Sequence, residues 1–331
     1  MLREGKMETA RKSKFYIADI IAKPETMVAL VLVLLCIVMT ILRPDTFPTM
    51  RNFIGILRQA APIAILAVGM GFVIITGGID LSVGSVVAFS ACVSLAVFQI
   101  FPWLPPIMVL LLCLGGGLLV GVINGLFISK VGIPPFIVTL GMMSIASGAA
   151  LVISGGHLIR YEPTWISVFG RGDIGPFPVQ VLVMLAVLFL SYIFANYTQM
   201  GRNIYAVGNS EQAAKLSGIS VDRVIITVYG ITGALAGLCA LILIGQFNSA
   251  HPSYGNGWEL QVIAAAVIGG ISMKGGEGNI LGVLLGALLI SVLRNMFAQL
   301  AIAGFWQTIV LGSVIILAVA IDCIRKKRIS H

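Results

Sequence analysis

The sequence is built from long apolar runs that are separated by short polar segments. A helix that crosses the hydrocarbon core of a bilayer needs about 20 mostly apolar residues. The runs that reach or approach this length are residues 26–43, 60–78, 81–101, 105–129, 134–154, 178–197, 224–246, 258–272, 279–299 and 304–321. We therefore expect an all-α integral membrane protein with about ten transmembrane helices. The eighth run is short, which is typical of a helix that is tilted, broken or shielded by protein.

The polar segments carry the charges that set the orientation in the membrane. If the N-terminus is cytoplasmic, most of the 21 Lys and Arg residues fall on cytoplasmic segments, as the positive-inside rule requires. The segment 49–59 mixes Arg51 and Arg58 with apolar residues, which predicts a short interfacial helix outside the membrane. The expected organisation is a cytoplasmic N-terminal segment (1–25), one transmembrane domain (26–322) and a basic cytoplasmic tail (323–331).

Composition supports the membrane assignment and removes other classes. The chain is 58% hydrophobic and only 10% charged, against roughly 25% charged residues in soluble domains. The net charge of +8 arises from basic residues at the ends of apolar runs, so it indicates membrane topology and not nucleic-acid binding. The five cysteines show no CxxC or Cys/His spacing, which predicts neither a disulfide framework nor a metal site.

Glycine spacing predicts how the helices pack. Residues four apart share a helix face, and a row without side chains lets two helix backbones approach closely. Two such rows occur: Gly117, Gly121 and Gly125, and Gly278, Gly282 and Gly286. We expect both rows to be helix-packing surfaces within a tight bundle.

The chain lacks the motifs of an enzyme or of a motor. There is no HExxH, GxSxG or GxxxxGK[ST] sequence, so we expect no catalytic residues, no metal site and no cofactor bound by this chain. Asp80, Glu259, Arg294 and Asp322 all fall near predicted span ends, whereas an ion-coupled carrier places acidic groups deep in its helices. If ATP drives transport through this chain, a separate ATPase subunit that binds ATP and Mg²⁺ must dock on its cytoplasmic side. The alternative is an ion-coupled secondary carrier or a passive channel for small polar solutes.

The predicted inner loop 198–223 contains a candidate docking element for such a partner. Its sequence resembles the EAA-xxx-G coupling loop of bacterial importer permeases. The two alanines favour a short helix that the following glycine can end. The residues concerned are Gly208, Asn209, Glu211, Gln212, Ala213, Ala214, Lys215, Ser217, Gly218 and Ile219.

A larger ordered set of motifs resembles the permease subunits of ribose/xylose/galactoside-type ABC importers. The resemblance covers roughly residues 50–322. It rests on Gly77-Gly78-Ile79-Asp80-Leu81-Ser82-Val83-Gly84-Ser85, Gly121-Val122-Ile123-Asn124-Gly125, Gly208-Asn209 with Ala213-Ala214 and Ser217-Gly218-Ile219, Ile263-Ala264-Ala265 with Gly269-Gly270 and Gly275-Gly276, Asn295, and Trp306-Gln307.

The resemblance implies a function and a set of partners. Two permease subunits, identical or different, would form one pathway in the inner cell membrane. They would sit on a pair of cytoplasmic ATP-binding subunits and receive the substrate from an extracytoplasmic sugar-binding protein. The implied substrate is a monosaccharide, such as a pentose or hexose, or a related small polyol.

Candidate pathway residues follow from polar groups near helix breaks. Gly77 and Gly78 should interrupt a helix, so that Asp80 and Ser82 either line or gate the pathway. Alternatively, Asp80 only caps the third span. The remaining candidates either bind sugar hydroxyls or form interhelical hydrogen bonds; they are Asn124, Asn295 and Gln307.

Overall fold

The structure, a computed structural model, describes residues 24–162 and 165–329 and is almost entirely helical. Its long helices are α2 (Pro24–Leu42), α3 (Met50–Ile75), α4 (Val83–Ile100), α5 (Ile107–Leu126) with the π-helical turn η1 (Phe127–Val131), α6 (Pro135–Ser154), α8 (Val179–Tyr197), α11 (Val221–Phe247), α13 (Gly282–Gln299) and α14 (Gly304–Ile329). The shorter helices are α7 (Ser167–Arg171), α9 (Gln199–Asn209), α10 (Glu211–Leu216) and α12 (Trp258–Ile268).

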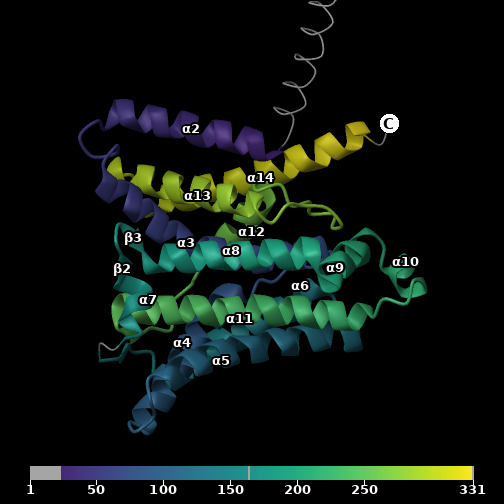
Figure 1. The fold of residues 1–331 in the computed structure, drawn as a ribbon, viewed down its shortest axis with the longest axis horizontal. Coiled ribbons are helices and arrows are strands. Elements are labelled where there is room, and N and C mark those ends of the chain that lie inside the picture. Colours follow the sequence, from purple (N-terminus) through teal and green to yellow (C-terminus); the bar gives the residue numbers. More distant parts are fainter. Residues whose placement is uncertain (1–23, 163–164, 330–331) are drawn as a thin grey trace, which may run out of the picture.

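The long helices run side by side, so that the bundle has two distinct ends (Figure 1). One end, here called the α7 end, carries α7 and two small antiparallel strand pairs. In these pairs β1 (Ile159–Arg160) joins β4 (Ser249–Ala250), and β2 (Asp173–Ile174) joins β3 (Phe177–Pro178). The opposite end, here called the α10 end, carries α9 and the projecting α10. Segments far apart in sequence therefore meet at the same end of the bundle.

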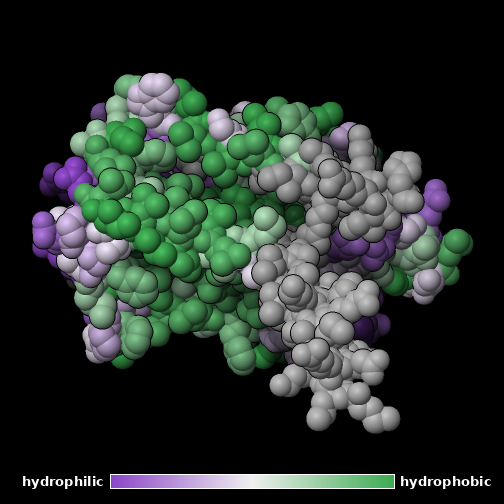
Figure 2. Space-filling view, turned by 90° about the horizontal axis from the view of Figure 1, so that it is seen from above, coloured by the Kyte–Doolittle hydropathy of each residue, from purple (hydrophilic) through white to green (hydrophobic). Residues whose placement is uncertain are grey.

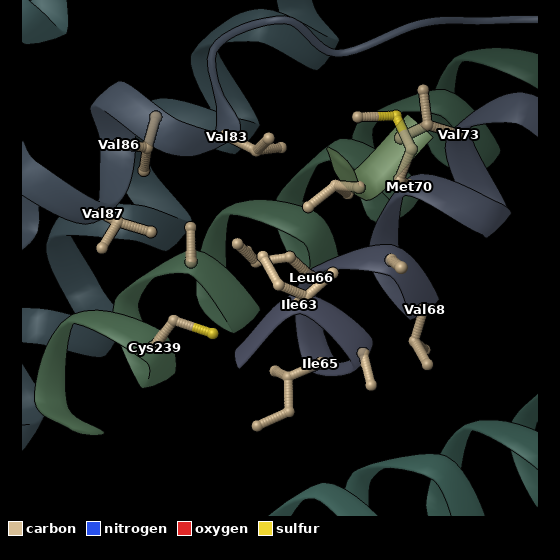
Figure 3. Packing of buried hydrophobic residues seen from close by; sticks show 14 of the residues in the cluster. Ile63, Ile65, Leu66, Val68, Met70, Val73, Val83, Val86, Val87 and Cys239 are labelled. Carbon is tan, nitrogen blue, oxygen red and sulfur yellow. The ribbon is translucent and has the colours of Figure 1, made fainter. Parts of the chain in front are cut away.

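Helices α3 and α11 form the centre of the bundle. In the most apolar part of α3, 89% of the residues are buried, against 17% in α6, which lies at the periphery. Figure 3 shows Ile63 and Leu66 of α3 between Val83 at the start of α4 and the α11 residue Cys239. Side chains of α3, α4 and α11 fill this part of the core, so the break between α3 and α4 lies inside the protein.

The outer surface matches a lipid environment. Figure 2 shows an apolar band across the middle of the visible face, with hydrophilic residues gathered at the two ends. Large apolar side chains such as Leu34, Ile41 and Phe189 are exposed on the long helices. Within the described residues, eight helices are long and apolar enough to cross a membrane: α2, α3, α4, α5 with η1, α6, α8, α11 and α13. The predicted integral membrane, all-α class is confirmed, whereas the count of ten and the orientation stay predictions.

The structure corrects the prediction of a separate interfacial helix at residues 49–59. The Thr49 hydroxyl accepts a hydrogen bond from the Asn52 N–H at 3.2 Å, and α3 then runs unbroken from Met50 to Ile75. Pro62 lies inside this helix without ending it, which membrane helices tolerate because neighbouring groups satisfy the freed backbone. The polar stretch is therefore the first part of the central helix.

Other boundaries also shift. Helix α14 continues to Ile329, so the predicted basic tail at 323–331 begins as helix, and residues 330–331 lie outside the described part. Most of the predicted N-terminal segment, residues 1–23, also lies outside the described residues. The eighth run becomes the 11-residue helix α12, which agrees with the prediction that this run is short or broken.

Candidate functional site: a plug between two cavities

Residues 76–82 leave the helical path between α3 and α4, and we call them the plug. Gly77 has a φ of 83°, a left-handed conformation that residues with a Cβ rarely adopt. The Gly77 and Gly78 N–H groups still bond back to the carbonyls of Ile74 and Val73, so α3 ends in a tight turn. Irregular backbone at membrane depth requires protein or water around it, and the plug is packed against the central helix α11 through Tyr229.

Four of the predicted pathway residues, Gly77, Gly78, Asp80 and Ser82, lie in the plug, and a fifth, Asn124, contacts it. The carboxylate of Asp80 is 2% exposed and accepts hydrogen bonds from the Ser82 N–H at 2.8 Å and the Ser82 hydroxyl at 2.6 Å. The Asn124 amide of α5 donates to the Ser82 hydroxyl at 3.0 Å. The Oδ1 atom of Asn124 is buried with no hydrogen-bond partner among the described residues. Asp80 thus fixes the turn before α4, and the same turn is tied to a second helix.

Two further hydrogen bonds hold the middle of the plug. The carbonyl oxygen of Ile79 accepts from the Thr139 hydroxyl of α6 and from the Tyr229 hydroxyl of α11, both at 3.3 Å. We call this pair of bonds the latch. The Thr139 hydroxyl shares its hydrogen with the Pro135 carbonyl at 2.9 Å. Neither Thr139 nor Tyr229 was selected from the sequence. The available signals were a tyrosine inside an apolar run and a threonine shortly after Pro134-Pro135.

A polar cavity lies on each side of the plug. The α10-end cavity has a volume of about 440 Å³, and its polar side chains are Thr76, Ser129, Glu211, Lys215, Asp222 and Tyr229. The α7-end cavity has a volume of about 460 Å³, and its polar side chains are Ser85, Ser144, Ser147, His251, Ser253, Tyr254, Asn256 and Glu259. Volumes of roughly 300–1,000 Å³ are typical of small-molecule sites.

Helix α6 borders both cavities. Pro135 at its start lines the α10-end cavity, and Met143 to Leu151 line the α7-end cavity. Between these two stretches, Thr139 contacts the Ile79 carbonyl in the plug. The order along α6 is therefore cavity, plug, cavity. The two cavities therefore share one helix and are separated along it by the contact with the plug.

The predicted docking residues form a capped projection at the α10 end. The Ser210 hydroxyl accepts from the Ala213 N–H and starts α10, and Gly218, with a φ of 79°, follows the helix end. Leu216 at the tip of α10 is 91% exposed. Glu211 forms an ion pair with Lys215 at 2.6 Å, and this contact raises the pKa of the Lys215 ammonium. The projection therefore combines an exposed apolar side chain, Leu216, with the charged side chains of Glu211 and Lys215.

Helix α9 connects this projection to the plug. Gly208 packs so closely on the last residue of α3 that a Cβ there would overlap the Ile75 carbonyl oxygen. The same carbonyl accepts a hydrogen bond from the Gly276 N–H at 2.8 Å. Tyr205 also donates to the Gly278 carbonyl at 3.0 Å. Because Ile75 directly precedes the plug, a movement of α9 acts on the plug through backbone contacts.

The structure does not bring the other pathway candidates to the plug. Asn295 of α13 donates to the Asn52 side chain at 2.7 Å and accepts from Gln299 at 3.1 Å. It therefore joins the start of α3 to the end of α13, at the α7 end. Gln307 lies half-exposed on α14, which packs on α12 and α13.

The glycine rows differ in their placement. In α5, Cβ atoms on Gly117, Gly121 and Gly125 would all overlap the backbone of α11. Gly278, by contrast, lies in the loop before α13 with a φ of 152° and does not share a helix with the rest of its row. The remaining two glycines of that row, Gly282 and Gly286, pack on the backbone of Gly269 and Ala265.

Comparison with known proteins places the chain in a family. Residues 52–319 match the family described as "Branched-chain amino acid transport system / permease component". The ribose import permease protein RbsC of Bacillus subtilis (strain 168) is 40% identical over 298 residues, which covers 89% of this chain and 91% of the relative. The protein of the same name from Escherichia coli (strain K12) is 37% identical over 319 residues, covering 95% of this chain and 98% of the relative.

A third relative has another sugar in its name. The galactose/methyl galactoside import permease protein MglC of Haemophilus influenzae is 33% identical over 317 residues, covering 90% of this chain and 94% of the relative. No solved structure matches the chain. The chain therefore belongs to the family of the branched-chain amino acid transport system / permease component, as a multi-pass permease subunit of the inner membrane and not an enzyme.

Proposed function

We propose that this chain is the membrane subunit of an ATP-driven importer that carries a monosaccharide through the bundle. One observation carries the proposal: two polar cavities border the same helix, α6, and are separated by a plug that hydrogen bonds hold in place. Opening first the α7-end cavity and then the α10-end cavity is alternating access. The α7 end would face outward and the α10 end the cytoplasm.

The relatives support a sugar as the substrate. Those compared above are named for ribose and galactose, and others for fructose and D-allose. The family description, in contrast, names branched-chain amino acids. The substrate class therefore has to be tested directly, with both kinds of solute.

Helix α10 is suited to dock on a separate ATPase subunit. Leu216 would lose its exposure to water in a partner's cleft, which favours association. Glu211 and Lys215 also line the α10-end cavity. A partner that moves α10 would therefore reshape the exit of the pathway as well as pull on the end of α3 through α9.

A second copy of a permease chain would pack against α6. This helix exposes Gly141, Ser144 and Gly148 at intervals of three and four residues, and small residues at such spacing let membrane helices approach closely. Ser144 also lines the α7-end cavity. The second subunit would thus close the open side of the pathway.

The α7 end offers a firm platform for a sugar-binding protein. Arg58 of α3 forms an ion pair with Asp173 in β2, and the Arg171 guanidinium donates to the Gln246 carbonyl at 2.7 Å. These contacts fix the long connection between α6 and α8 on the central helices. A binding protein would meet a preformed surface there.

Reconstitution tests the function. The chain is placed in vesicles with a candidate ATPase subunit and a candidate sugar-binding protein from the same organism, with ATP on the ATPase side. We expect uptake of a labelled monosaccharide that requires ATP and all three components. Uptake by the chain alone, uptake abolished by an uncoupler but independent of ATP, or uptake of leucine in place of sugars would contradict the proposal.

A second prediction concerns the leak of sugar through the protein in the absence of ATP, which the latch should limit. In the double variant Thr139→Val, Tyr229→Phe, the Ile79 carbonyl loses both hydrogen bonds while the packing volume changes little. Each bond contributes about 0.5–1.5 kcal/mol, so the open population should rise roughly 5- to 100-fold. We expect faster efflux of sugar from loaded vesicles without ATP. Thr308→Val, which removes an exposed hydroxyl on α14, is the control, and an unchanged leak in the double variant would contradict the gating role.

A further inference from the structure

We infer that the α7-end cavity is where the permease itself holds its substrate, with Ser85 and Glu259 binding the hydroxyl groups of a neutral sugar. This inference rests on the proposed function and adds the site and its chemistry. The cavity of about 460 Å³ is lined by Gly156 and His251, which lie close to β1 and β4 in the chain. Its polar lining stands out in a chain of which 58% is hydrophobic.

The lining groups match the groups of a polyol. Hydroxyls and amides both donate and accept hydrogen bonds, and a carboxylate accepts from several donors at once. A monosaccharide presents hydroxyls in every direction and needs such a mixed surface. The groups that supply it are Ser85, Ser147, His251, Ser253, Asn256 and Glu259.

A close contact between two glycines brings the two anchor residues together. Gly84 at the start of α4 and Gly255 in the loop before α12 pack backbone to backbone, and a Cβ on Gly84 would lie 2.9 Å from a Glu259 carboxylate oxygen. Ser85, the residue after Gly84, therefore lines the same cavity as Glu259 although 174 positions in the numbering separate them. The Ser85 hydroxyl donates to the Ser82 carbonyl at 2.8 Å, which leaves its oxygen to accept from a ligand.

The charge pattern selects against anions and amino acids. No Lys or Arg lines this cavity, and in residues 24–162 and 165–329 no basic side chain forms an ion pair with Glu259. Glu259 lies in the first turn of α12, where its charge complements the free N–H groups of the helix start. A substrate carboxylate would meet this acid without a cation to balance it. A neutral polyol would instead donate hydroxyl hydrogens to the acid.

The site is also connected to the plug. Ser85 bonds to the Ser82 carbonyl, and the Ser82 hydroxyl is bound by Asp80 and Asn124. A sugar that forms a hydrogen bond with Ser85 would therefore also affect Ser82, the last residue of the plug. Substrate occupancy and plug position would be coupled through one short segment.

Thiol labelling tests the site without depending on transport. Ser147→Cys places a thiol in the cavity, and a membrane-impermeant maleimide is added from the α7 side of the nucleotide-free complex. The parent protein, in which Cys92, Cys113 and Cys239 are buried, gives the background. D-ribose, D-galactose, D-fructose, D-allose and L-leucine are each tested for protection. We expect a sugar to slow labelling and leucine to have no effect.

A second substitution tests the role of the acid. In the Ser147→Cys background, Glu259→Gln should raise the sugar concentration for half-protection about tenfold or more, because hydrogen bonds to charged groups are the stronger ones. Glu162→Gln, an exposed acid at the same end but outside the cavity lining, is the matched control and should change nothing. Labelling without ligand should be equal in all three proteins, which shows that they are folded.

The outcomes separate this inference from the proposed function. Protection by a sugar that Glu259→Gln weakens supports the site. ATP-driven sugar uptake with no protection by any sugar overturns the site and leaves the importer function standing. Protection by leucine alone overturns both.

Discussion

Replacing Gly208 with alanine should abolish sugar uptake by the reconstituted complex while ATP hydrolysis continues. The added Cβ would overlap the Ile75 carbonyl oxygen and lie 2.6 Å from the Gly276 nitrogen. Both are backbone atoms that cannot rotate away, so α9 must separate from the end of α3. The ATPase would then move α9 and α10 without moving the plug. We expect uptake to fall at least about 100-fold, which corresponds to a loss of roughly 3 kcal/mol of coupling.

Gly55→Ala is the matched control for this prediction. Gly55 lies inside α3 with no atom within 4 Å of the position of a Cβ, so the same substitution meets open space there. Alanine also favours a helix over glycine by about 1 kcal/mol. Uptake by this variant should equal that of the parent. Wild-type uptake by Gly208→Ala would show that the α9 contact with Ile75 does not transmit motion.

The second large effect concerns stability. Gly121→Leu inserts a side chain where a single Cβ on α5 would already overlap the Tyr229 carbonyl oxygen of α11. The two helices must move apart along their whole contact, because Gly117 and Gly125 also meet the α11 backbone. Overpacking of this kind costs roughly 1–3 kcal/mol or more. We expect a large drop in the unfolding temperature of the purified protein in detergent, or failure to accumulate in the membrane.

Gly115→Leu on the same helix provides the comparison. Gly115 is exposed, and no atom lies within 4 Å of the position of a Cβ there. The same residue change at this position should leave the unfolding temperature near that of the parent. Equal destabilisation by the two variants would mean that leucine harms α5 itself and that the close contact with α11 is not the cause.

Much of the fold could be predicted because a bilayer imposes a simple rule on each helix. Every long run of apolar residues became a helix, and Gly77-Gly78 did end one. The error at residues 49–59 has a local cause. A prediction from apolar length places the start of α3 too late, because Arg51, Asn52 and Arg58 interrupt the apolar run. Thr49 is nevertheless a typical N-cap residue for this helix.

The candidate site could be predicted only in part, because tertiary contacts determine which polar side chains lie next to one another. Asp80, Ser82 and Asn124 do meet in the plug, and each carries a polar group in an apolar region. Asn295 looked equivalent in sequence but lies at another place, bonded to Asn52. The pairing of Ser85 with Glu259 depends on two glycines in different segments, which no spacing within one segment reveals.

The position of α6 has a consequence for how such a transporter can change. In the proposed pathway, α6 would line the entrance cavity, the plug and the exit cavity. A substitution that tilts this helix to admit a bulkier solute would also alter the plug and the exit cavity. On this proposal, substrate range and turnover are linked through α6, and a chain that acquires a new substrate by changes in α6 would also change its transport rate.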